Sequence, residues 1–271
     1  MIVFSHGGGA RDPCSFGNPE WGTTLAGAGY VVVHISHNLD SQTQSFACGQ
    51  IGVPACTETE ALRYLRPGDA RVVIDELQRI ATGFGLIDRM NLDKVAIAGH
   101  SFGAYTAMTI AGARFDVGTL ANQSYADPRI TSVLALSPQG PDRFGFFDRG
   151  ASGNSWMSIA VPVLVQTGAG DSLLGESASD RRIPFRLMPP PDKAEAFLND
   201  PRAMHNTFNL NDPGAPPEFF TWIASVAIAW FDATLQERAT AWSWLASDAL
   251  TQVSGGLEEI SRKQLASPAG P

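Results

Sequence analysis

The sequence predicts an α/β fold, in which helices cover a mostly parallel β-sheet. Strand-like and helix-like segments alternate along the 271 residues, and this alternation is typical of a parallel sheet with helices on both faces. Charged residues make up only 17% of the chain, against about 25% in an average soluble domain. Strands that are buried on both faces consume apolar residues, so a low charged fraction fits this fold class. The 27 glycines and 18 prolines indicate many tight turns.

The net charge limits the choice of partner. The chain carries 19 Lys and Arg against 27 Asp and Glu, a formal charge of −8, which argues against nucleic acid or an anionic membrane surface. No apolar run approaches the length of a membrane-spanning helix, which is about 20 residues. We therefore expect no nucleic-acid partner and no membrane span, while an oligomer stays possible.

In the first third of the chain, the local pattern predicts two strands and two helices. Residues Ile2 to Ser5 form the first expected strand, and Trp21 to Ala28 the first helix. Tyr30 to Ile35 is a continuous β-branched run, as expected of a strand buried on both faces. Residues 38–65 lose this periodicity and are predicted to be an inserted loop or small lid. A helix from about Asp69 to Thr82 follows, with its apolar residues on one face.

The remaining elements continue the alternation. Lys94 to Ala98 is predicted to be a strand, and Tyr105 to Ala113 the helix after it. Residues 138–158 form a connection rich in glycine and aromatic residues. Three further strands are expected at 130–136, at 161–167 and, more weakly, at 193–198, and two helices at 216–235 and 237–250.

The organisation is that of one domain. We expect a single domain over residues 1–254, with loop insertions at about 38–65 and 138–158, and a C-terminal tail over 255–271. No secretory signal is visible in this chain, and a strand at the first residue is unusual because termini fray. We expect the first strand to lie beside an uncovered edge of the sheet, which upstream sequence or another chain would cover.

A G-x-S-x-G motif connects the strand before Gly99 to the helix after it. Gly99-His100-Ser101-Phe102-Gly103 predicts a sharp turn that lifts the Ser101 hydroxyl above the sheet. At Gly99 and Gly103 a side chain would collide with the neighbouring strand and helix. By itself the motif is weak; its position between a strand and a helix makes Ser101 a candidate nucleophile.

A serine nucleophile needs a base and an acid. Chain order in this architecture is serine, acid, histidine, and among the five histidines only His205 lies in a loop after the last expected strand. Asp171 follows the end of the preceding strand, where a carboxylate is well placed to orient an imidazole. Asp180 and Asp192 are weaker candidates on polar loop sequence.

The third requirement is an oxyanion hole built from backbone N–H groups. One N–H is expected from Phe102, beside the nucleophile. The other is expected from the turn after the first strand, where Gly8 is the preferred donor and Gly9 the reserve.

These stretches together resemble the α/β-hydrolases. The similarity is to the dienelactone-hydrolase-related group that includes platelet-activating-factor acetylhydrolase-like and polyester-hydrolase-like enzymes. It covers about residues 2–235 and is carried by residues 3–9, 66–75, 99–104, 162–171, 188–193 and 205–208. The resemblance implies that Ser101 is the nucleophile, that Asp171 orients the histidine and that His205 is the general acid and base. Ser101 stands where true dienelactone hydrolases have a cysteine nucleophile, which argues against a dienelactone as the substrate.

The expected activity is hydrolysis of carboxylic esters, small or polymeric, through an acyl-enzyme and without a metal or organic cofactor. Candidate substrate contacts are Gly9, His37, Phe144 and Trp156, although packing explains His37 and the aromatic residues as well. Cleavage of polyesters or amides is the alternative within the same fold. A non-catalytic binding protein is the alternative from another class.

Cys48 and Cys56 bracket a short loop that contains glycine and proline, and they could form a local disulfide. Cys14 would then stay unpaired.

Overall fold

A seven-stranded sheet forms the centre of the molecule, which we describe from a computed structural model over residues 1–8, 19–141, 147 and 154–265. Its strand order is β2-β1-β3-β6-β7-β8-β9. Neighbouring strands run parallel except β9, which is antiparallel to β8. The strands are β1 (Ile2–Ser5), β2 (Val32–Ile35), β3 (Val95–His100), β6 (Ile130–Leu136), β7 (Val163–Gly168), β8 (Lys193–Leu198) and β9 (Glu258–Lys263). The predicted α/β fold with a mostly parallel sheet is therefore confirmed.

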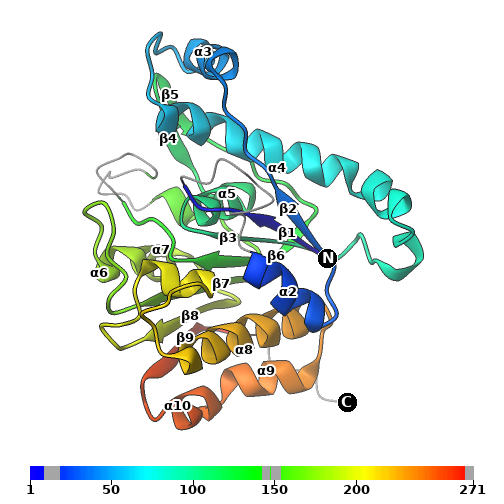
Figure 1. The fold of residues 1–271 in the computed structure, drawn as a ribbon, viewed down its shortest axis with the longest axis vertical. Coiled ribbons are helices and arrows are strands. Elements are labelled where there is room, and N and C mark those ends of the chain that lie inside the picture. The colour runs from blue at the N-terminus through cyan, green and yellow to red at the C-terminus, as the bar shows by residue number, and fades with distance from the viewer. Residues whose placement is uncertain (9–18, 142–146, 148–153, 266–271) are drawn as a thin grey trace.

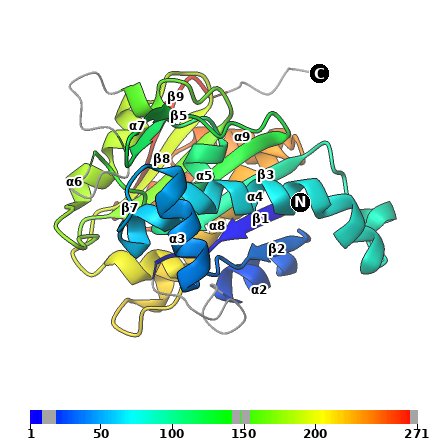
Figure 2. The same cartoon turned by 90° about the horizontal axis from the view of Figure 1, so that it is seen from above.

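Helices cover both faces of this sheet (Figures 1 and 2). Strand residues alternate between the two faces, so that Val3 and Ile97 pack in one core while Ile2 and Phe4 pack in the other. Helices α4 (Glu58–Gly83) and α5 (Phe102–Ile110) cover the first face; α2 (Pro19–Gly27), α8 (Pro217–Thr234) and α9 (Ala239–Ala246) cover the second. The shorter helices are α3 (Ser41–Gln50), α6 (Ala178–Arg181), α7 (Ile183–Leu187) and α10 (Ala249–Val253). Three 3₁₀ turns lie at Ile87–Arg89, Asn154–Trp156 and His205–Asn209.

Helix α4 begins eleven residues before the predicted start at Asp69. Thr57 and Glu60 form a capping box there, which satisfies the first N–H groups of the helix. The helix then continues through Pro67, which has no N–H to donate to the carbonyl of Arg63. The hydroxyl of Tyr105 on α5 donates to that carbonyl instead, at 2.9 Å. A tertiary hydrogen bond thus replaces the one that the proline removes.

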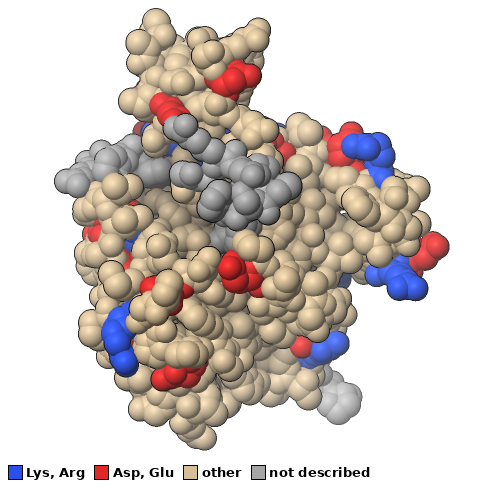
Figure 3. All heavy atoms as spheres, viewed as in Figure 1, with Lys and Arg blue, Asp and Glu red and all other residues tan. Residues whose placement is uncertain are grey.

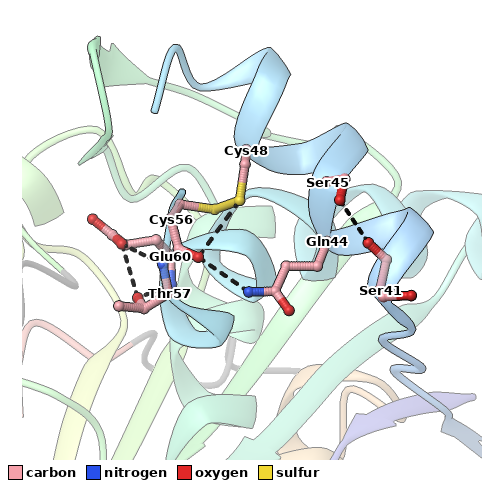
Figure 4. The surroundings of a disulfide bond; sticks show 7 residues. All are labelled: Ser41, Gln44, Ser45, Cys48, Cys56, Thr57 and Glu60. Carbon is pink, nitrogen blue, oxygen red and sulfur yellow. Dashed lines mark hydrogen bonds between the residues drawn. A yellow bond between two sulfur atoms is a disulfide. The ribbon is translucent and has the colours of Figure 1, made fainter. Parts of the chain in front are cut away.

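The predicted insertion at 38–65 forms helical structure that a disulfide holds together. It consists of α3 and the first turns of α4, joined by a disulfide between Cys48 and Cys56, as Figure 4 shows. A small antiparallel pair of strands, β4 (Phe115–Val117) and β5 (Leu120–Gln123), packs beside it. Thr119, at the turn of this pair, donates through its N–H and its hydroxyl to the carbonyl of Ile51. The local sequence did not predict this pair.

Three expectations about the sheet are wrong. Strand β1 does not lie at an edge, because it pairs with β2 on one side and β3 on the other. The edge belongs to β2, whose residues Val32 to His34 are only half-buried rather than buried on both faces. The stretch expected to be a tail contributes β9, whose six residues pair along the whole of β8. Pairing order is set by the tertiary fold, which a local pattern does not report.

The described surface has few charges for its size. On the face in Figure 3, acidic and basic side chains are scattered and form no extended patch of one sign. None of the helices described is long and apolar enough to cross a membrane.

Candidate active site

Ser101 lies in a strained turn between β3 and α5. Its backbone has φ 54° and ψ −118°, a conformation that costs a non-glycine residue about 1–3 kcal/mol. A Cβ on Gly103 would lie 1.9 Å from the carbonyl oxygen of Ser5, and a Cβ on Gly99 2.3 Å from the backbone of Gly103. The two glycines therefore allow β1, β3 and α5 to approach closely, as the motif predicted. Ser101 itself is half-buried and immediately precedes α5.

His205 and Asp171 come together from two loops at the carboxyl ends of β7 and β8. Nδ1 of His205 lies 2.8 Å from Oδ1 of Asp171. The other ring nitrogen of His205, Nε2, is buried and has no hydrogen-bond partner in the described part of the chain. An imidazole held by a carboxylate on one side and open on the other can accept a proton at Nε2.

Asp171 is fully buried, and the side chains of Thr167, Arg181 and His205 contact its carboxylate. The hydroxyl of Thr167 donates to Oδ2 at 2.8 Å, and Nε of Arg181 lies 2.8 Å from Oδ1 and 3.1 Å from the carbonyl of Asp171. Burial alone would raise the pKa of Asp171, but the hydrogen bond from His205 and the charge of Arg181 outweigh it and hold this pKa below its usual value. Asp171 is therefore a carboxylate at neutral pH and can stabilise a protonated His205.

His100 connects the serine turn to the histidine loop. Its Nε2 lies 2.9 Å from the carbonyl oxygen of His205, and the two rings are 4.6 Å apart. Burial and, to a smaller extent, the neighbouring His205 lower the pKa of His100 to about 3, so His100 is neutral and Nε2 donates to that carbonyl. Because His100 directly precedes Ser101, this contact fixes the serine turn and the His205 loop to each other.

The turn after β1 lies against the serine turn. A Cβ on Gly7 would be 3.5 Å from Cβ of Ser101, and a Cβ on Gly8 would be 3.9 Å from the ring of Phe102. Gly8 is exposed, whereas Phe102 is buried and occupies the first turn of α5, where helix N–H groups point out of the helix end. The two N–H groups expected to form an oxyanion hole thus lie on adjacent segments beside Ser101.

A buried arginine holds this turn from behind. Arg66 of α4 donates through Nη1 to the carbonyl of His6 at 2.6 Å and through Nη2 to the carbonyl of Gly7 at 3.1 Å. Its guanidinium carbon lies 4.1 Å from the centre of the Phe102 ring. One side chain therefore contacts both segments of the expected oxyanion hole.

A second chain of serine, histidine and aspartate lies beside the first. Oγ of Ser5 is 2.9 Å from Nε2 of His37, whose Nδ1 is 2.8 Å from Oδ2 of Asp69. Ser5 is completely buried, and so is the side chain of His37. His37 therefore lies behind the turn that follows β1, where burial keeps its side chain out of reach of a substrate.

The other predicted site residues divide as follows. Trp156 is fully buried and packs on Phe147, with ring centres 4.9 Å apart, so it is part of the core. Gly9 and Phe144 lie outside the described residues. Asp180 accepts from the N–H and the hydroxyl of Ser177 as a helix cap, whereas the carboxylate of Asp171 contacts His205.

Sequence reasoning missed the three buried supports Arg66, His100 and Arg181. A charged residue in a polar stretch shows the same local pattern whether it is exposed or buried, so Arg181 gave no signal. No group of three or more His, Cys, Asp or Glu side chains among the residues described is arranged to hold a metal ion.

Neither a protein-family model nor a curated protein sequence matches this chain. Several solved structures are similar to it. An esterase from Pyrobaculum calidifontis is 15% identical with a TM-score of 0.50, over 84% of this chain and 76% of that one. A Klebsiella pneumoniae protein assigned to the dienelactone hydrolases is 12% identical with a TM-score of 0.50, over 85% of each chain. A puromycin-hydrolysing peptidase from Mycobacterium tuberculosis is 15% identical with a TM-score of 0.55, over 86% of this chain but 34% of that one.

Proposed function

The chain has the α/β-hydrolase fold, and we propose that it is a serine hydrolase that cleaves carboxylic esters through an acyl-enzyme. Ser101 is the nucleophile, His205 the general base and acid, and Asp171 the carboxylate that orients His205. The backbone N–H groups of Phe102 and Gly8 form the oxyanion hole.

The observation that carries this proposal is the conformation of Ser101. A positive φ is energetically unfavourable for a serine. Ser101 adopts it between Gly99 and Gly103, which have no room for a side chain. It also directly follows His100, which contacts the His205 loop. Backbone strain of this kind persists only where the surrounding structure enforces it, and it is concentrated at functional sites.

The chemistry follows from the donors and acceptors at the site. Nε2 of His205 takes the hydroxyl proton of Ser101 while Oγ forms a bond to the ester carbonyl carbon. The carbonyl oxygen becomes an oxyanion that accepts hydrogen bonds from Phe102 and Gly8. When the tetrahedral intermediate collapses, the C–O bond to the alcohol breaks and His205 returns its proton to that alcohol. Water, activated by His205, then hydrolyses the acyl-serine in the same two stages.

Labelling with a fluorophosphonate tests the nucleophile. We expect the wild type to gain one phosphonyl group, located by peptide mass spectrometry on Ser101, and Ser101→Ala to gain none. Ser225→Ala is a matched control, because Ser225 lies on α8 and its hydroxyl donates to the helix carbonyl of Thr221. If wild type and Ser101→Ala label equally, the proposal is wrong and a non-catalytic binding protein becomes the better interpretation.

The bond that is cleaved could belong to one of three substrate classes: small esters, polyesters or amides. The similar structures include an esterase and a peptidase, so the shared fold favours neither bond. A chain-length series of p-nitrophenyl esters, compared with the matching anilides and with a polyester film, separates these classes. We expect ester cleavage that depends on Ser101, and activity confined to anilides would contradict the ester assignment.

A further inference from the structure

Arg66 is a buried cation whose hydrogen bonds go to backbone carbonyls. It is 2% exposed, and within the described ranges no carboxylate forms an ion pair with it. Its two bonds go to the consecutive carbonyls of His6 and Gly7. A planar guanidinium can bind two acceptors at once with fixed geometry, which an ammonium cannot do.

The geometry of the peptide bond links these contacts to the oxyanion hole. The carbonyl of Gly7 and the N–H of Gly8 belong to one planar trans peptide unit, in which C=O and N–H point in opposite directions. Arg66 binds that carbonyl at 3.1 Å, and Nδ1 of His6 lies 2.7 Å from the same oxygen. Holding the oxygen therefore turns the Gly8 N–H away from Arg66. His6 belongs to the same turn, so without Arg66 this peptide unit of a glycine-rich segment would be free to rotate together with His6.

A second set of contacts holds the same turn through the same helix. Asp69 lies one turn after Arg66 on α4 and reaches the turn through His37, which binds Ser5 and donates its backbone N–H to Nε2 of His6 at 3.4 Å. Two side chains of α4 thus act on the segment between Ser5 and Gly7, one directly and one through an imidazole.

The charge of Arg66 suits a site in which negative charge develops. Burial lowers the pKa of Arg66 to about 9, so it stays protonated at neutral pH. Burying this cation is unfavourable in the resting protein, and the charge of Asp69 offsets part of that cost. An oxyanion formed beside Gly8 and Phe102 would lie close to this cation and reduce that cost only during the reaction.

We propose that Arg66 is the positioning residue of the oxyanion hole: it orients the peptide unit between Gly7 and Gly8 and supports Phe102, and so acts on the transition state without touching the substrate. This inference rests on the proposed serine-hydrolase function. It adds to the hydrolase site a residue of α4 that lies outside the motif around Ser101.

The experiment compares Arg66→Met and Arg66→Lys with the wild type. Loss of one oxyanion donor typically costs about 100- to 1000-fold in kcat, and a misaligned donor costs less, so we expect a fall of about 30-fold or more for Arg66→Met with KM within about three-fold. Arg66→Lys keeps the charge but not the planar fork, and about ten-fold is expected for it.

Arg63→Met is the matched control. Arg63 is also a buried arginine of α4, about one turn earlier, and its Nη2 donates to the carbonyl of Asp116. Its removal measures the effect of deleting a buried guanidinium from this helix. We expect it to lower the thermal stability and to leave kcat within about three-fold of the wild type.

A thionoester substrate distinguishes positioning from a general structural role. Sulfur is a weaker hydrogen-bond acceptor than a carbonyl oxygen, so a working oxyanion hole favours the ester over its thionoester. We expect this ratio of kcat/KM values to collapse toward unity in Arg66→Met and to stay at the wild-type value in Arg63→Met. Unchanged kcat and an unchanged ratio in folded Arg66 variants would overturn the inference.

The result also separates this inference from the proposed function. Ester cleavage that persists in Ser101→Ala refutes the proposed function itself. Ester cleavage that needs Ser101 but is insensitive to Arg66 refutes only the role of Arg66. If Arg66→Met does not fold, Arg66→Lys decides, because it retains the charge and most of the length of the side chain.

Discussion

At the scale of single residues, the close approach of β1 to α5 makes Gly103 more sensitive to substitution than Gly68. Gly103 meets the carbonyl of Ser5 and Gly68 has open space around it, although both lie in helices. The requirement for glycine at position 103 therefore comes from tertiary contact and not from helix propensity.

We expect Gly103→Ala to destabilise the protein by about 2 kcal/mol or more and to abolish ester cleavage, because the new methyl group must push β1 away from the serine turn. Gly68→Ala is the control and should stabilise the protein by about 0.5–1 kcal/mol, since alanine favours the helix. Urea denaturation of both variants measures these values. Equal stabilities of the two variants would contradict the close approach.

At the scale of elements, α4 is the helix that organises the site. It carries Arg66 and Asp69 toward the turn after β1, and it accepts Tyr105 of α5 at the carbonyl that Pro67 leaves open. The proline thus leaves an acceptor that joins α4 to α5, the helix after Ser101.

A double-mutant cycle measures this link. Tyr105→Phe leaves the buried carbonyl of Arg63 without its donor, at a cost of about 1–2 kcal/mol. In the background of Pro67→Ala the backbone N–H of residue 67 becomes available to that carbonyl, so the cost of Tyr105→Phe should fall by about 1 kcal/mol. Equal costs in both backgrounds, measured by chemical denaturation, would show that the two groups do not share the acceptor.

The disulfide is the other device that holds α4. It closes the segment from Cys48 to Cys56, and a loop of this size contributes about 2–3 kcal/mol on the loop-closure model. We expect dithiothreitol to lower the melting temperature of the wild type and to leave that of a Cys48→Ala, Cys56→Ala variant unchanged. An identical response of both proteins to the reductant would contradict a contribution from this bond.

At the scale of the whole molecule, β9 brings a buried acid to the end of the sheet. Glu258 is completely buried, and neither carboxylate oxygen has a hydrogen-bond partner in the residues that the structure describes. Burial raises the pKa of Glu258 to about 8. The folded protein therefore holds a proton on Glu258 at a pH where the unfolded chain, with a pKa near the ordinary value of about 4.3, has released it.

Global stability should consequently fall as the pH rises between about 4.3 and 8, since the native state binds more protons than the unfolded state in this window. Glu258→Gln removes this dependence, so its stability relative to the wild type should increase by about 2–4 kcal/mol from pH 5 to pH 8. Glu259→Gln, on the exposed side of the same strand, is the control. Parallel stability curves for wild type and Glu258→Gln would contradict this.

The local pattern predicted what depends on neighbours in sequence. The serine turn and the strand Lys193–Leu198 were predicted at the correct residues, because glycine spacing and apolar runs depend on local geometry. The order of strands depends on contacts between distant segments, so the β-branched run ending at Ile35 was taken for a central strand although β2 is an edge. Strand β9 was missed because Glu258 to Lys263 is mostly charged and polar.

The supports of the site were missed for the same physical reason. Arg181 lies in a polar stretch and becomes informative only when β7 and α6 bring it to Asp171. Gly8 and Phe102 were predicted as oxyanion donors from their positions beside a strand end and beside Ser101, and these roles stay predictions. The side chain that holds them comes from a helix whose start was misplaced by eleven residues.

The set of Ser5, His37 and Asp69, in which Ser5 and the side chain of His37 are buried, has a consequence for recognising active sites from coordinates. It reproduces the atom-to-atom connectivity of a catalytic triad, with distances of 2.9 and 2.8 Å. A search template built from three such side chains would return it. The burial of Ser5 and the backbone torsion of Ser101 distinguish this set from the one in which Ser101 is the proposed nucleophile.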